Sequence, residues 1–152
     1  MPKTYRGEFT NSQILYSTNE GLEQNVIVLI IDQNDASDEQ IDIDLADNPV
    51  TIRVVDNNED KFTPIRSKSC EIRLHTNPNI NIITFGSGGD NQYKVQICMN
   101  YTSNVIFEGW LSISDLRQDF QPDPNLLVLT ATDGLGFLKD VPLTNFDGVQ
   151  FK

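Results

Sequence analysis

The chain has 152 residues, of which 38% are hydrophobic and 22% are charged, a composition typical of one globular domain with a sizeable core. Its formal net charge is -11, which disfavours tight nucleic-acid binding because phosphate affinity depends on clusters of Lys and Arg. No stretch approaches the roughly 20 apolar residues of a membrane span, so we expect no membrane insertion.

Strand patterns dominate the first half of the sequence. A short strand is expected at residues 4–9, and the continuous apolar run at 26–31 indicates a strand buried on both faces. Residues 41–45 alternate strictly between apolar and acidic side chains, which predicts one strand with a solvated acidic face. Pro49 is expected to break this strand, and residues 50–55 resume as a strand.

The middle of the chain continues in the same way. Residues 69–75 and 93–99 alternate and are predicted strands, whereas 80–85 is a short apolar run that fits either a small strand or one helical turn. Cys70 is in phase with the core positions of its strand, and Cys98 is out of phase with those of its own. Because alternation places the two thiols on different faces, we expect both to be free.

Two further strands are predicted at residues 105–112 and 126–132, separated by a polar, proline-containing connection. Asp133 is placed to cap a short helix over residues 134–139, and Pro142 prevents its continuation. The whole pattern predicts about eight short strands in a single all-β domain over residues 1–152. Either an antiparallel barrel or a sandwich fits this pattern.

Catalytic chemistry has little support in the sequence. His75 is the only histidine and projects from the polar face of its predicted strand, as a surface histidine does. The glycine-rich stretch at 86–89 lacks the Lys-Ser/Thr ending of a phosphate loop, and we read it as a flexible connection. We therefore expect no enzymatic activity and no cofactor.

The acidic segment at residues 32–47 carries the main alternative. Carboxylates at this density are able to coordinate Ca²⁺, which takes six to eight oxygen ligands. A solvated acidic face that deters edge pairing explains the same residues. The alternative function is thus a β-sandwich module that binds Ca²⁺ or a glycan, with these candidate Ca²⁺ ligands: Asp35, Asp38, Glu39, Asp42 and Asp44.

A longer pattern in the second half resembles a known family. An apolar run with Phe-x-Gly-Trp is followed by a proline-containing loop and by Leu-x-Leu-x-Ala-x-Asp-Gly-Leu-Gly-x-Leu-Lys-Asp. This pattern resembles large baseplate hub or tail-tip proteins of phages and prophages of Bacteroidetes-type bacteria. The matching residues are Phe107, Gly109, Trp110, Leu127, Leu129, Ala131, Asp133, Gly134, Leu135, Gly136, Leu138, Lys139 and Asp140, with an upstream block at 60–74.

The resemblance implies a structural role in a phage or prophage tail. Proteins of that kind are built from tube-like β domains that form rings, so it implies a homo-oligomer, a trimer or hexamer, that contacts other tail proteins. It also implies a location in the virion, or in the bacterial cytoplasm during assembly, and a chain that is either the N-terminal part of a longer tail protein or a short version of it. Aromatic side chains without an obvious intramolecular partner are the interface candidates: Phe107, Trp110, Phe146 and Phe151.

Overall fold

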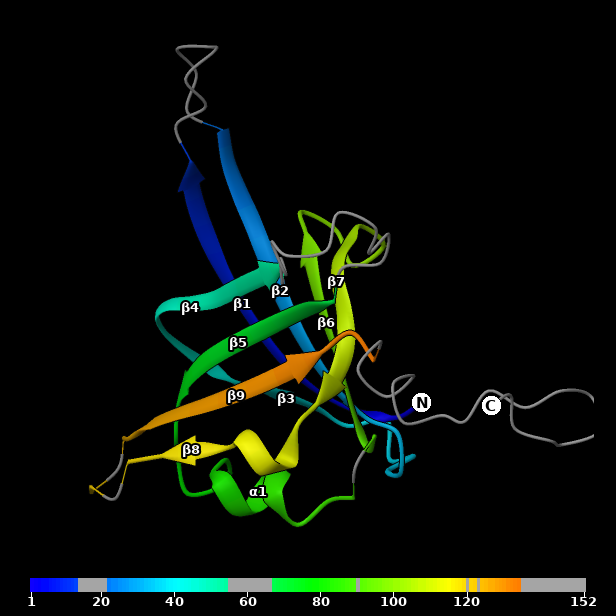
Figure 1. The fold of residues 1–152 in the computed structure, drawn as a ribbon, viewed down its shortest axis with the longest axis vertical. Helices are drawn as coiled ribbons and strands as arrows, with labels where there is room; N and C mark the ends of the chain where they lie inside the picture. Colours follow the sequence, from blue (N-terminus) through cyan, green and yellow to red (C-terminus); the bar gives the residue numbers. More distant parts are fainter. Residues whose placement is uncertain (14–21, 55–66, 90, 120, 123, 135–152) are drawn as a thin grey trace, which may run out of the picture.

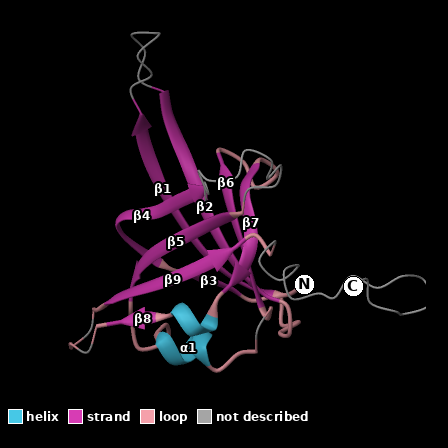
Figure 2. Ribbon diagram, in the orientation of Figure 1, coloured by secondary structure: helices cyan, strands magenta, loops and turns pink. Residues whose placement is uncertain are grey.

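A computed structural model describes residues 1–13, 22–54, 67–89, 91–119, 121–122 and 124–134. The strands are β1 (Lys3–Gln13), β2 (Leu22–Asp32), β3 (Gln40–Asp42), β4 (Asp44–Val54), β5 (Lys68–His75), β6 (Tyr93–Met99), β7 (Val105–Leu111), β8 (Arg117–Gln118) and β9 (Leu126–Thr132). They are joined by a short helix, α1 (Ile82–Gly86), and a 3-10 turn, η1 (Ile113–Asp115) (Figure 2). The all-β prediction is confirmed.

All nine strands belong to one sheet, in the order β3-β1-β2-β6-β7-β9-β5-β4, with β8 paired to β9. The sheet bends back on itself, so that β4, β5 and β9 cross over β1, β2 and β6 (Figure 1). We refer to β3, β1, β2, β6 and β7 as the first layer and to β9, β5 and β4 as the second layer. The ladder does not close into a barrel, and the arrangement corresponds to the sandwich alternative. Because β3 lies parallel to β1, the sheet is mixed rather than purely antiparallel.

The hydrophobic core fills the space between the layers. Alternating residues of β2 and β6, such as Val28 and Ile97, face those of β5 and β9, such as Ile72 and Leu129, and each of these four is fully buried. The run at 26–31 has the expected apolar character on both faces, although every second residue near its end is half-buried. Strand alternation therefore determines which residues form the core.

Gly109 lies where the two layers join. β7 and β9 pair through only two residue pairs, Trp110 with Thr132 and Leu111 with Ala131. A Cβ atom on Gly109 would lie 2.3 Å from the carbonyl oxygen of Thr132. The absence of a side chain at this position thus allows the two backbones to approach and the sheet to continue from one layer into the other.

The strands at the two opposite ends of the sheet order, β3 and β4, follow each other directly in the chain. β3 pairs with β1, and the backbone N–H of Ile43 donates to the carbonyl oxygen of Arg6 at 2.8 Å before β4 begins in the second layer. The prediction of one continuous strand over 41–45 is wrong at this point, because the chain changes layers. Pro49 does not end β4 either, since a register shift between Leu45 and Val50 accommodates it.

The apolar run at 80–85 forms a helix rather than a strand. Asn81 caps α1: its side chain accepts from the backbone N–H groups of Ile83 and Thr84, and the Thr84 hydroxyl accepts from the N–H of Asn81. Phe85 then packs edge-on against the rings of Tyr5 and Tyr93 at one end of the core. The helix predicted at 134–139 lies outside the described residues, apart from Gly134, whose φ is 78°.

Candidate functional site

The four aromatic interface candidates have different positions. Phe107 is only 2% exposed and belongs to the core, so its proposal as an interface residue is wrong. Trp110 projects from the outer face of β7, is half-buried, and lies beside Lys94 of β6 and Thr132 of β9. Phe146 and Phe151 lie outside the described residues. Trp110 is therefore the interface candidate that the structure leaves accessible.

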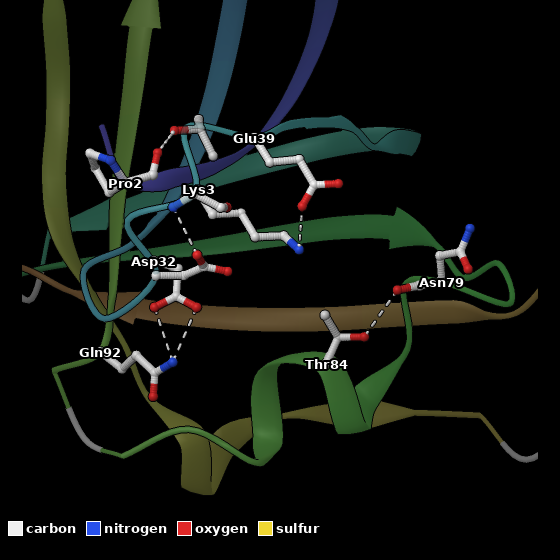
Figure 3. Close-up of polar contacts among 10 residues, drawn as sticks. Pro2, Lys3, Asp32, Glu39, Asn79, Thr84 and Gln92 are labelled. Carbon is white, nitrogen blue, oxygen red and sulfur yellow. Dashed lines mark hydrogen bonds and ion pairs between the residues drawn. The ribbon is translucent and has the colours of Figure 1, made fainter.

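The acidic segment does not form a cation site in the described part of the chain. Lys3 forms an ion pair with Glu39 at 2.8 Å (Figure 3), and this contact raises the pKa of the lysine. The carboxylate of Asp35 accepts from the backbone N–H of Ser37, and hydrogen bonding to Ser37 lowers its pKa. Among the described residues no three His, Cys, Asp or Glu side chains converge on a point able to hold a metal ion, and Asp38, Asp42 and Asp44 are exposed.

Asp32 is the one buried carboxylate of this segment, at 7% exposed. Its two oxygens accept from the side-chain amide of Gln92 at 3.0 and 3.2 Å (Figure 3). The amide oxygen of Gln92 in turn accepts from the backbone N–H of Gly89 at 3.1 Å. The glycine-rich stretch is thus anchored to the end of β2, and this network holds the fold rather than presenting a reactive group.

The two thiols and the histidine are placed as structural residues. Cys70 and Cys98 are both free and fully buried, which confirms the expectation of unpaired cysteines. Burial raises the pKa of Cys70 to about 12 and also raises that of Cys98, so both are neutral thiols near pH 7. His75 is half-buried on β5 and lies opposite Asp44 of β4 and Leu126 of β9.

The β1–β2 pair extends beyond its neighbours (Figure 1). β3 pairs with Thr4–Arg6 only, and the pairing of β6 with β2 stops at Val26. Four residue pairs, from Thr10 with Asn25 to Gln13 with Leu22, continue the hairpin beyond that point. We call these eight residues the β1–β2 ribbon, and no other described strand flanks it.

The outer edge of β1 offers backbone groups for pairing. The N–H of Thr4 donates to Glu39 and the carbonyl of Arg6 accepts from Ile43, each at 2.8 Å, so the even-numbered residues of β1 direct their backbone groups to this side. Because alternate residues of a strand share a direction, those of Glu8 and Thr10 also point outward. The paired stretch of β1 contains no proline and no bulge, two common devices that protect strand edges.

A groove of about 720 Å³, whose surface is polar and apolar in equal measure, opens between the layers where the ribbon emerges. Its first side is formed by β1, β2, β6 and β7 and its second side by β4. Asp47 is the only charged residue among those that line it. The full lining is Phe9, Thr10, Val26, Ala46, Asp47, Asn48, Pro49, Val50, Thr51, Ile52, Ile97, Met99 and Ile106.

The groove exists because the layers diverge. At Gly7 they touch, and an added Cβ would lie 2.8 to 2.9 Å from side-chain atoms of Leu45 and Ile43. Beyond Gly7 the first layer continues past β4, which leaves Phe9 and Met99 half-buried instead of covered. Sequence reasoning did not find this groove, because neither alternation nor composition reports which strand ends a sheet.

The described helices include none that is long and apolar enough to cross a membrane. No known protein family, curated protein or solved structure matches the chain.

Proposed function

We propose that the protein is a structural component of a phage or prophage tail, part of a baseplate hub or tail-tip assembly, and that it acts by homo-oligomerisation and contacts with other tail proteins. The β1–β2 ribbon is the observation that carries this proposal. A two-stranded ribbon is at best marginally stable in water by itself, and an open strand edge is a template for pairing with another chain. In an assembly subunit, the open edge would pair with a neighbouring chain, and that pairing would stabilise the ribbon.

The residues that carry the family resemblance support a structural role. Gly109, Trp110 and Ala131 belong to the short β7–β9 junction between the two layers. Leu127 and Leu129 are fully buried core residues of β9. These residues join the two layers and fill the core, as is expected in a protein that acts through its shape.

The charge balance is compatible with the same role. The chain has 22 acidic residues against 11 basic ones. An acidic surface repels nucleic-acid phosphates, and a lumen through which DNA passes needs a wall that does not bind it. The acidic residues 38, 42 and 44 are solvent-exposed and contribute to such a surface.

The proposal is tested by the molar mass of the protein in solution, measured by light scattering after size exclusion. The expected mass is three or six times that of the 17.1 kDa chain. Thr10→Pro removes one outward N–H from the edge of β1 without touching the bonds to β2, so it should dissociate the oligomer and leave the circular dichroism spectrum unchanged. Ile83→Thr, on the exposed face of α1, is the matched control and should remain oligomeric.

A monomer at all concentrations would contradict the proposal. A monomer whose melting temperature rises with Ca²⁺ and falls with chelator would instead favour the alternative binding module. An oligomer that Thr10→Pro leaves intact would retain the assembly role and exclude the β1 edge as its contact.

A further inference from the structure

We infer that the groove beside β4 is a binding site for an extended segment of a partner polypeptide, which adds to the outer edge of β4 as a further strand. This inference goes beyond the proposed self-association, because it requires no second copy of the chain. The partner is a peptide with alternating apolar residues, a basic residue at one end and an acidic residue at the other.

The edge of β4 supplies the backbone pairing. β4 is the last strand in the sheet order and pairs with β5 on its other side. The register shift contains Pro49, and Asn48 has a φ of 49°, so the free edge of β4 is regular only beyond the shift, where Val50 to Val54 pair in sequence with β5. A strand added here would extend the second layer, which is the narrower of the two at this end, across the first layer. Main-chain pairing of this kind gives affinity, while pockets for alternate side chains give specificity.

The floor of the groove explains the apolar half of the peptide. Phe9 and Met99 are half-buried, and Ile106 is 36% exposed, although all three face a space bounded by two layers. Alternate side chains of an added strand would point onto this floor, as those of Val50 and Ile52 already point into the core. The groove volume of about 720 Å³ lies within the range of natural ligand sites. Covering this floor removes apolar surface from water and thereby favours binding.

The charges at the two ends of the edge determine the ends of the peptide. Asp47 lines the groove at the register shift, and a cationic side chain beside it would be favoured. Arg53 is exposed near the other end of β4, and an acidic residue on the adjacent strand would pair with it. An antiparallel partner therefore begins with an acidic residue and ends with a basic one.

The probe is the fluorescein-labelled heptapeptide Glu-Val-Thr-Ile-Thr-Val-Lys, with both ends blocked. Aligned antiparallel to the regular part of β4, it places Glu beside Arg53 and places Val and Ile beside Ile52 and Val50, and its C-terminal Lys extends past the register shift toward the side of the groove that Asp47 lines. Fluorescence anisotropy with the full-length protein should show saturable binding. Ile106→Glu introduces a charge into the groove floor at a position that tolerates exposure, and it should weaken binding by about tenfold or more. Ile83→Glu, 71% exposed and on α1, should leave the affinity unchanged.

Two N-methylated peptides test whether the peptide binds as a strand. One carries methyl groups on the amides of its apolar residues, and the other carries them on the amides of its threonines. Because alternate amides of a strand face opposite sides, only one of the two should lose binding. Exchange of the terminal Glu and Lys should also weaken binding by several-fold at low salt.

No saturable binding to the wild-type protein, equal binding of both methylated peptides, or no effect of Ile106→Glu would each overturn the inference. Light scattering of the peptide-free protein tests the assembly proposal separately, so failure of the peptide site and failure of self-association can be told apart. A monomer that binds the peptide retains the strand site and loses self-association, whereas an oligomer that does not bind it shows the reverse.

Discussion

Replacing Gly109 with alanine should destabilise the fold more than any other single methyl group added to a described glycine. The new Cβ would lie 2.3 Å from the carbonyl oxygen and 2.7 Å from the carbonyl carbon of Thr132. Carbon–oxygen contacts reach about 3.3 Å, so β7 and β9 would have to separate by about 1 Å. Only two residue pairs join these strands, and a separation of that size would weaken their hydrogen bonds.

The cost follows from two contributions. Overpacking in a well-packed interior costs about 1 to 3 kcal/mol, and each weakened backbone hydrogen bond adds about 1 kcal/mol. We therefore expect Gly109→Ala to lower the free energy of unfolding by about 3 kcal/mol, a large part of the roughly 5 to 15 kcal/mol of a typical domain. Urea denaturation followed by circular dichroism measures this change directly.

Gly89→Ala is the matched control. No heavy atom lies within 4 Å of the Cβ position at Gly89, so this change should be neutral or slightly stabilising. A Gly109→Ala protein within about 0.5 kcal/mol of the wild type would refute the close approach of β7 to β9 at the layer junction.

Three further changes should have measurable effects. Gln92→Glu places a second carboxylate beside Asp32, and repulsion between the two ionised groups should lower the free energy of unfolding by about 2 kcal/mol at pH 8 and by less at pH 5, where added protons relieve the repulsion. An equal loss at both pH values would contradict the contact. The pKa of Cys70 rises from 9.0 to about 12 on folding, so the folded state holds this proton more tightly and the free energy of unfolding decreases between these two values as pH increases. In urea denaturation, Cys70→Ala should therefore show a shallower alkaline decline than the wild type, by up to about 1.4 kcal/mol per pH unit. Parallel declines of the two proteins would refute this linkage. Asn81→Ala removes the cap of α1 and should cost about 1 kcal/mol, also measured with urea, whereas no change would show that the helix is held by Phe85 alone.

Local patterns predicted the strands well, because alternation and composition are properties of consecutive residues. Residues 26–31, 69–75, 93–99, 105–112 and 126–132 all lie within or closely overlap described strands. Alternation also correctly placed Cys70 in the core.

The misplaced elements depend on interactions that local patterns do not report. The break at Ile43 results from the passage of the chain from β3 in the first layer to β4 in the second, and β3 pairs in parallel with β1, a strand far away in sequence. At residues 80–85 the sequence fitted either a small strand or one helical turn, and the structure has the helical turn α1, capped by the pair Asn81 and Thr84. Pro49 remains in β4 because the register shift beside it removes the need for its missing N–H.

The candidate site was less predictable than the fold. Phe107 and Trp110 are close in sequence and both aromatic, but one is a core residue and the other is half-buried on the outer face. The open edges and the groove depend on the order of strands in the sheet, which is decided by long-range pairing. A sequence without an alignment of relatives contains no direct record of that pairing.

The strand order also affects how this chain folds as it is synthesised. β2 pairs with β6, for example Val26 with Met99, and β5 pairs with β9, for example Ser69 with Thr132. In each case the second strand is synthesised long after the first. Until β9 leaves the ribosome, the second layer consists of the β4–β5 pair, which has an apolar face and no strand pairing with the first layer. Such long-range pairing is slow, on the order of milliseconds to seconds, and it leaves strand edges exposed in the meantime. We therefore expect chaperone binding to nascent chains to be greatest after β5 has emerged and to end once β9 is complete.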